Sequence, residues 1–326
     1  MKGVYKDVVD LIGNTPIVRL NRIAPAGGAA IYAKIEFLNP GASVKDRIGV
    51  RMILDAEASG KLRPGGTIVE ATSGNTGMGL ALVAAARGYR CVFVMAEKIS
   101  TEKVKALEAF GARVVTTPEV PPEDPRSLYS VARRIAEETP NALFMNQYEN
   151  PSNPLAHERT TGPEIWDQMG ADLDAVVICA GTGGTITGTG RYLKKMKPSI
   201  RVVAVDPVGS IFYGYAKTGK ADPADVKPYK VEGFGEDYIP GSIDFSVIDD
   251  WVQVDDRECF LMARDLTRKE GLFAGGSGGG AVAGALKWAN DHPDARTILV
   301  ILPDSGARYL SKLFDDGWMR ANSFLA

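Results

Sequence analysis

The sequence has little of what metal-dependent and disulfide-bonded proteins are built from. It holds three cysteines and two histidines among 326 residues. Cys91, Cys179 and Cys259 stand far apart without metal-ligand spacing, and their odd number argues against a disulfide framework. His157 and His292 are too few for a zinc site or for a Ser/His/Asp or Cys/His catalytic arrangement. We therefore expect no metal, and a structural role for Cys179 and for His157, the latter at a helix start.

Long apolar runs and an excess of one charge are also missing. No segment reaches membrane-spanning length without charges, and no apolar stretch follows the first residues to form a signal peptide. The net charge of -2 gives no reason to expect nucleic acid or a membrane surface as a partner. We expect a cytoplasmic protein that binds small molecules, and its length predicts two domains or one large α/β unit.

What the chain does contain is a regular alternation of short apolar strands and amphipathic helices. The strands centre on residues 17–20, 31–36, 68, 91–94, 114–115, 176–178, 202–205 and 298–301. One helix follows Lys45 and stops at Gly60, and further helices are expected at 76–87, 101–110, 127–138, 156–169, 186–196, 257–270 and 279–291. This alternation predicts parallel sheets covered on both faces, with the main boundary near Asn150.

Two glycine-rich loops organise the rest of the chain. Residues 71–77 (ATSGNTG) and 181–185 (GTGGT) each follow a β-branched run and precede an apolar helical run. Glycines at a strand-to-helix corner let backbone N–H groups approach a ligand, and the helix N-terminus adds partial positive charge. One loop falls on each side of the boundary. We therefore expect two anionic groups, or one ligand with two anionic ends, between the two halves.

The second loop supports three interpretations. With Asp206 closing the next strand, it resembles the dinucleotide site of an oxidoreductase, in which Asp206 would bind a ribose. Ile186 stands where that fingerprint needs its third glycine. The hydroxyls of Thr182, Thr185 and Thr187 instead favour a compact phosphate monoester held by several donors. The third interpretation is a tight turn that binds nothing.

Lys45 is the candidate for covalent chemistry. Residues 43–46 have the form of a capping box, which places Lys45 in the first turn of a helix. The positive end of the helix dipole favours the neutral amine, and a neutral amine is needed for a Schiff base with an aldehyde cofactor. The alternative is a surface lysine that happens to follow a cap.

Three further stretches have features of ligand-binding segments. Residues 72–76 offer hydroxyls, an amide and backbone N–H groups that suit a small carboxylate, although they also fit a well-capped helix without a ligand. Residues 275–280 (GGSGGG) open a helix in mid-domain, which favours close backbone contact with a ligand over a linker. Residues 207–250 are irregular but retain Phe, Tyr and Ile, and we expect functional loops there.

Four motifs resemble those of one family, and the likeness runs from residues 12–16 to 302–306. In order along the chain they are residues 40–47 (PGASVKDR), 72–77 (TSGNTG), 181–185 (GTGGT) and 275–277 (GGS). They resemble the cysteine synthase / cystathionine β-synthase family, pyridoxal-phosphate enzymes of the tryptophan synthase β fold (fold type II). The resemblance implies an α/β protein of two three-layer domains with parallel-rich sheets and pyridoxal 5′-phosphate in the cleft between them. The smaller, mobile domain would comprise residues 44–150 and carry the carboxylate loop, and the larger would comprise residues 1–43 plus 151–326.

The resemblance also implies roles for individual residues. Lys45 would be the Schiff-base lysine and the base that removes the substrate α-proton. Further cofactor contacts would come from Asn75 to the phenolic oxygen, Ser277 to the pyridine nitrogen, and Gly181, Thr182, Gly183, Gly184 and Thr185 to the phosphate. Substrate would be bound by Thr72, Ser73, Thr76 and Gln147 at the carboxylate, and by Tyr148, Gly233 and Glu236.

The two branches of the family share features with this chain. Residues 231–240 (VEGFGEDYIP) and 146–148 (NQY) resemble cystathionine β-synthases, whereas 160–166 and 304–309 resemble cysteine synthases. Glu236 replaces a tyrosine common in the animal synthases, and the chain is expected to lack their regulatory domains and haem-binding extension.

The activity that the resemblance implies is β-replacement, first of all L-serine with L-homocysteine giving L-cystathionine. The second candidate is O-acetylserine or O-phosphoserine with sulfide, giving cysteine, and a homodimer is implied in either case. A dinucleotide-dependent oxidoreductase is disfavoured by the missing glycine and by Lys45. A non-catalytic binding protein on the same scaffold would require that Lys45 be dispensable.

Overall fold

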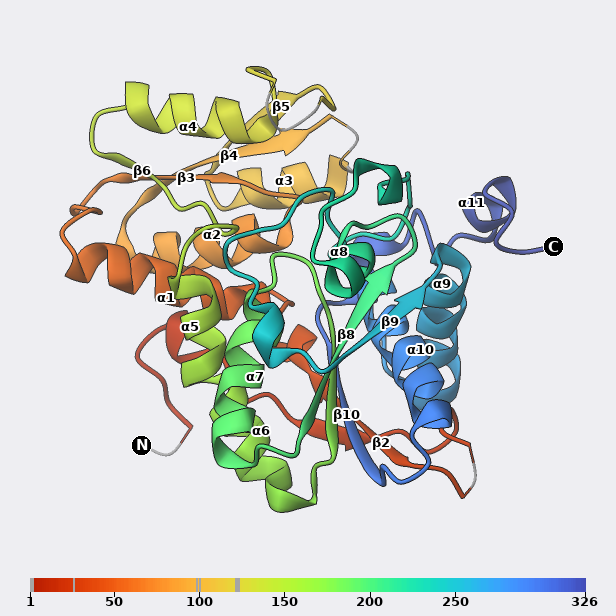
Figure 1. Cartoon of the computed structure of the whole chain (residues 1–326). Coiled ribbons are helices and arrows are strands. Elements are labelled where there is room, and N and C mark those ends of the chain that lie inside the picture. The colour runs from red at the N-terminus through yellow and green to blue at the C-terminus, as the bar shows by residue number, and fades with distance from the viewer. Residues whose placement is uncertain (1–2, 26, 98, 100, 121–123) are drawn as a thin grey trace.

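The protein contains two β-sheets with helices on both faces of each (Figure 1). The computed structural model describes residues 3–25, 27–97, 99, 101–120 and 124–326. The mixed α/β architecture with mostly parallel strands confirms the predicted fold class. Among the described residues, no helix is both long and apolar enough to cross a membrane.

The larger sheet has six strands in the order β1-β2-β10-β7-β8-β9. All neighbours are parallel except β1, which pairs antiparallel with β2. In chain order the strands are β1 (Ile17–Arg19), β2 (Ala30–Ile35), β7 (Ala175–Cys179), β8 (Arg201–Pro207), β9 (Asp250–Val254) and β10 (Thr297–Leu302). The last strand of the chain therefore lies in the middle of this sheet.

The smaller sheet has four parallel strands in the order β5-β4-β3-β6. They are β3 (Thr67–Ala71), β4 (Arg90–Ala96), β5 (Arg113–Thr117) and β6 (Ala142–Phe144). All four come from one continuous part of the chain. Whether residues 44–150 move as a unit stays a prediction.

Helices cover each sheet from both sides (Figure 1). Those around the smaller sheet are α1 (Lys45–Ala58), α2 (Asn75–Arg87), α3 (Thr101–Ala109) and α4 (Leu128–Glu138). Those around the larger sheet are α5 (Ser152–Arg159), α6 (Thr161–Met169), α7 (Gly184–Met196), α8 (Phe212–Thr218), α9 (Asp256–Asp265), α10 (Gly276–Asp291) and α11 (Asp316–Ala321).

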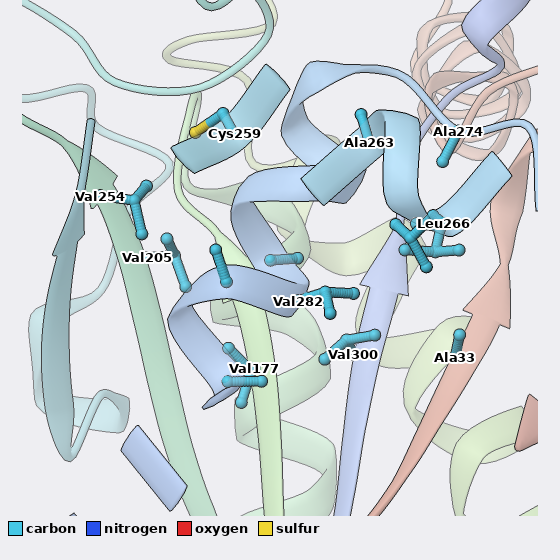
Figure 2. Packing of buried hydrophobic residues seen from close by; sticks show 14 of the residues in the cluster. Ala33, Val177, Val205, Val254, Cys259, Ala263, Leu266, Ala274, Val282 and Val300 are labelled. Carbon is cyan, nitrogen blue, oxygen red and sulfur yellow. The ribbon is translucent and has the colours of Figure 1, made fainter. Parts of the chain in front are cut away.

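Alternate residues of a central strand enter different cores because successive side chains point to opposite faces of a sheet. In β7, Val177 packs with Val282 of α10 and Val300 of β10, whereas Ile178 packs on the opposite face. Figure 2 shows the first of these cores, between the sheet and helices α9 and α10. The larger sheet is thus the middle of three layers.

Two glycines bring α1 and α2 into close contact. A Cβ on Gly49 would overlap the backbone of Gly79, and a Cβ on Gly79 would overlap the backbone carbonyl of Lys45. Only glycine fits at this crossing. The contact sets Lys45, the first residue of α1, beside the first turns of α2.

Several details differ from the sequence-based predictions. The expected capping box is wrong, because the Asp46 carboxylate accepts a hydrogen bond from Gly41 N at 2.5 Å instead of binding back to Ser43. The helix expected over residues 156–169 is interrupted at Thr160, where α5 ends and α6 begins. His157 lies in the last turn of α5 and not at a helix start. Strands β6 and β9 and helices α8 and α11 were not predicted.

Candidate active site

A cavity of about 280 Å³ lies beyond the carboxyl ends of β3, β6, β7 and β10. Helices α1, α2, α7 and α10 all begin at its wall, where Lys45, Asn75, Gly183 and Ser277 lie. The N-terminus of each helix carries partial positive charge and free N–H groups, so their convergence favours anionic ligands. The cavity is thus built to hold negative charge at more than one point.

Most of the predicted site residues meet in this cavity. Its lining includes Lys45, Ser73, Asn75, Thr76, Gln147, Tyr148, Gly181, Thr182, Gly183, Thr185, Gly233, Glu236 and Ser277. Thr72 and Gly184 do not belong to the lining. Thr72 Oγ1 accepts hydrogen bonds from Gly74 N and Gly77 N, so it shapes the loop from behind. The roles of Thr72 and Gly184 in ligand binding remain predictions.

The loop before α7 has a backbone conformation that requires glycine at residue 183. Gly183 has a φ of +85°, in the left-handed region, and a Cβ there would overlap Ile243. Thr185 Oγ1 lies 3.2 Å from His157 Nε2, and His157 Nδ1 lies 2.9 Å from Thr161 Oγ1. Burial holds the pKa of His157 well below its usual value, so the ring is neutral. The buried His157 ring therefore helps to fix the position of the Thr185 side chain. The sequence did not predict this contact.

Gln147 connects the loop after β3 to the rest of the site. Thr76 Oγ1 donates to Gln147 Oε1 at 2.6 Å, and Gln147 Nε2 donates to Ala71 O at 3.3 Å. The backbone N–H of Gln147 donates to Glu70 Oε2 at 3.3 Å. Burial raises the pKa of Glu70 to about 8. These contacts hold the Gln147 side chain against the first turn of α2.

Two residues that the sequence did not single out join Gln147 to the glycine loop. Asn153 Nδ2 lies 2.7 Å from Gln147 O and 2.9 Å from Thr182 Oγ1. Ser242 Oγ lies 2.7 Å from Tyr148 O and 2.8 Å from Thr182 O. Asn153 lies beside the boundary expected near Asn150, and its contact with Thr182, like that of Ser242, joins segments that are distant in the sequence.

Two carboxylates act on Lys45, Glu236 in the cavity lining and Asp304 outside it. Burial lowers the pKa of Lys45 to about 8, while the charges of Glu236 and Asp304 act in the opposite direction. Burial raises the pKa of Glu236 to about 8, with Asp237 adding to the rise and Lys45 opposing it. The amine can therefore lose its proton near neutral pH, as a nucleophile or general base must. The surface-lysine interpretation is wrong, since Lys45 lines the cavity.

Aromatic side chains flank Glu236. The ring of Tyr148 lies 5.4 Å from that of Tyr129 and 5.7 Å from that of Tyr238, and the Tyr148 side chain acts to lower the pKa of Glu236 against the effect of burial. Tyr129 comes from α4 and Tyr238 from the irregular stretch before β9. This end of the cavity thus combines an ionisable carboxyl group with tyrosine side chains from both parts of the chain.

Two alternative interpretations of the sequence lose their support. Asp206, the proposed ribose ligand of a dinucleotide site, is fully buried, lies outside the cavity lining, and accepts a hydrogen bond from Tyr213 N at 3.0 Å. Residues 275–280 do not form a linker, because α10 begins at Gly276 and Ser277 lines the cavity. Among the described residues, no group of three His, Cys, Asp or Glu side chains could hold a metal ion.

Comparison with known proteins agrees with this geometry. The family described as pyridoxal-phosphate dependent enzymes matches residues 8–304. A cystathionine beta-synthase of Apis mellifera is 48% identical over 99% of this chain, and the chain spans 64% of that protein, which is less than two thirds of its length.

Two solved structures are also similar. An O-ureido-L-serine synthase has a TM-score of 0.88 and 41% identity, covering 97% of this chain and 99% of its own. An O-acetylserine dependent cystathionine beta-synthase from Helicobacter pylori has a TM-score of 0.87 and 39% identity, covering 95% and 98%.

Proposed function

The chain belongs to the family of pyridoxal-phosphate dependent enzymes, and from this premise we propose that it catalyses β-replacement on serine or an activated serine. In the first-choice reaction, L-serine and L-homocysteine give L-cystathionine and water: the Cβ–O bond breaks and a Cβ–S bond forms. The observation that carries the proposal is the meeting of Lys45 with four helix N-termini and Glu236 in one cavity. The names of the similar proteins, which include cystathionine beta-synthases, support it.

The donor set of the cavity fits pyridoxal phosphate. The glycine loop at the start of α7 offers N–H groups and threonine hydroxyls for a phosphate, and Lys45 offers an amine for the aldehyde. Asn75 Nδ2 uses one of its two N–H groups on Asp304, and Asn75 Oδ1 is buried without a hydrogen-bond partner among the described residues, so the amide has both a donor and an acceptor left for a ligand. We assign Asn75 to the phenolic oxygen and Ser277 to the pyridine nitrogen.

Bound pyridoxal phosphate supplies an electron sink for the substrate carbon that loses its proton. In the proposed mechanism, Lys45 Nζ takes that α-proton, and its lowered pKa suits this task near neutral pH. Thr72, Ser73, Thr76 and Gln147 hold the substrate carboxylate at the positive end of α2, with Thr72 acting through the shape of the loop. The neutral Ser277 hydroxyl leaves the ring a weaker sink than a carboxylate would, which favours elimination over a long-lived carbanion.

Crowding at Gly183 provides a test of the phosphate loop. Gly183→Ala is expected to weaken pyridoxal phosphate binding about tenfold, because the new methyl group overlaps Ile243 and strains the loop. The matched control is Gly219→Ala, since Gly219 has a similar φ of +69° but no atom within 4 Å of the added Cβ. Titration of the cofactor-free proteins gives both Kd values. Equal Kd values for the two variants would contradict the assignment of the loop.

Glu236 is our candidate for recognition of the second substrate. Homocysteine carries an ammonium group whose positive charge favours the ionised form of the Glu236 side chain and can pair with it, whereas sulfide has no such group. Glu236→Gln is therefore expected to raise the KM for homocysteine about tenfold and to leave the KM for sulfide unchanged. Glu137→Gln, which makes the same substitution at an exposed residue of α4 outside the cavity lining, is the control.

A product assay on the purified protein tests the proposed reaction. Serine, O-acetylserine and O-phosphoserine are each offered with homocysteine or with sulfide. Preference for homocysteine supports the cystathionine reaction, and preference for sulfide supports the second candidate, cysteine synthesis. Absence of product with every pair would refute β-replacement on these substrates.

Closure of residues 44–150 over the substrate is part of the proposal. Lys103 of α3 forms an ion pair with Glu232, which lies outside residues 44–150, so this contact would break on opening. Lys103 also packs under Gly74 of the carboxylate loop. Assembly as a homodimer and a cytoplasmic location remain predictions.

A further inference from the structure

Asp304 joins the two halves of the cavity at a point that the proposed mechanism leaves unused. It follows β10 and is buried, with 1% of its surface exposed. Its Oδ2 accepts a hydrogen bond from Asn75 Nδ2 at 2.9 Å and another from the Tyr309 hydroxyl at 2.6 Å. Asn75 is the first residue of α2 and lines the cavity. Asp304 thus connects the central strand of the larger sheet to a proposed cofactor contact.

The bond to Asp304 decides which way the Asn75 amide faces. An ionised carboxylate only accepts hydrogen bonds, so the amide nitrogen of Asn75 must point to Asp304 and the amide oxygen away from it. An amide nitrogen has two N–H groups, and Asp304 occupies one of them. The other N–H is left for a further acceptor. If the amide turned over, its oxygen would face the carboxylate and the pair would repel.

Asp304 is itself held in place from several sides. Gly275 N donates to Asp304 O at 3.0 Å, and a Cβ on Gly275 would overlap the Asp304 carboxylate. Val44 N, next to Lys45, donates to Pro303 O at 2.8 Å. The carboxylate therefore has little freedom to follow a rotating Asn75, and it fixes the amide relative to the start of α1.

We propose that Asp304 is a positioning residue that orients the Asn75 amide so that its second N–H donates to the phenolic oxygen of pyridoxal phosphate. This inference rests on the proposed contact between Asn75 and that oxygen. A donor at the phenolic oxygen stabilises its ionised form, which absorbs in the visible range, over the neutral phenol, which absorbs in the near ultraviolet. Asp304 acts on this balance only through Asn75.

The absorption spectrum of the holoenzyme tests the inference without measuring turnover. Asp304→Asn can either accept from Asn75 or donate to it, so both amide orientations become populated. We expect the ratio of visible to near-ultraviolet absorbance to fall about twofold or more, because the charge-assisted bond that selected one orientation is lost. Asp304→Ser, a smaller residue, serves as a second variant in case the first does not fold, and thermal melting checks both.

The control is Asp206→Asn, which makes the same substitution at a buried carboxylate near the carboxyl end of β8, outside the cavity lining. Its spectrum is expected to match that of the unaltered protein. An altered spectrum in Asn75→Ala with unaltered spectra in both Asp304 variants would overturn the role of Asp304 alone. Unaltered spectra in Asn75→Ala and in both Asp304 variants would overturn the proposed contact between Asn75 and the phenolic oxygen, and this inference with it.

Discussion

Replacement of Lys45 by alanine is expected to lower kcat about a thousandfold or more, because the proposed reaction loses both its nucleophilic amine and its base. Lys45 lines the cavity and has a pKa lowered to about 8 by burial, so it is the described amine best suited to both roles. The measurement is the steady-state rate of product formation with the substrate pair that the unaltered protein prefers.

Two further measurements make the Lys45 experiment specific. Lys61→Ala alters an exposed lysine in the turn after α1, and its rate is expected to stay within about twofold. Borohydride reduction followed by peptide mass analysis should find the cofactor attached to Lys45 in the unaltered holoenzyme. A Lys45→Ala protein with undiminished turnover would disprove the assignment and favour the non-catalytic or differently catalysed alternatives.

Arg47→Met is expected to lower the free energy of unfolding by about 3–5 kcal/mol, because it leaves buried carboxylates without their countercharge. Arg47 Nε donates to Glu36 Oε2 at 2.7 Å, and Arg47 Nη1 donates to Glu164 Oε1 at 2.7 Å. The Arg47 and Glu36 side chains are 1% and 0% exposed. The network joins α1 to the segment after β2 and to α6. Urea denaturation followed by circular dichroism measures the loss.

Arg51→Met is the matched control because Arg51 lies one turn further along the same helix. Its pair with Asp55 is an i,i+4 contact, with side chains 26% and 29% exposed, so we expect a loss below about 1 kcal/mol. A similar loss of unfolding free energy in both variants would show that the burial of the Arg47 ion pairs does not explain their contribution to stability.

The pH dependence of stability gives a second check on this network. Burial alone would raise the pKa of Glu164, but hydrogen bonds and charges from Arg47, with Lys34, lower it to about 2. A depressed carboxyl pKa contributes stability that is complete above the unfolded-state value of about 4.3 and is lost as the pH falls toward 2. The Arg47 variant should lose part of this dependence, whereas the Arg51 variant should keep it.

The central part of the fold could be predicted because its signals are local. Buried strands such as β4 and β7 are continuous apolar runs, and the glycine loops mark the strand-to-helix corners that face the cavity. The missed strands β6 and β9 are edge strands with one neighbour each and are mostly half-buried, so they lack such runs. Their formation depends on the strand beside them.

The supporting contacts of the site could not be predicted for a related reason. Asn153 and Ser242 contact Thr182, and Asp304 contacts Asn75, from segments far away in the sequence. No local pattern identifies such pairs. The failed capping box illustrates the same limit: Ser43 and Asp46 have the right spacing, but Asp46 instead binds Gly41, just before a left-handed turn at Ala42.

The position of β10 has a consequence for the order in which the protein can fold during synthesis. Strands β3 to β6 are contiguous, so the smaller sheet can assemble once residue 144 has left the ribosome. In the larger sheet, β10 lies between β2 and β7 and is the strand that connects them. β1 and β2 can pair with each other early, but they cannot join the rest of the larger sheet until residues 297–302 have been synthesised. The part of the cavity wall that contains Pro303 is completed only then.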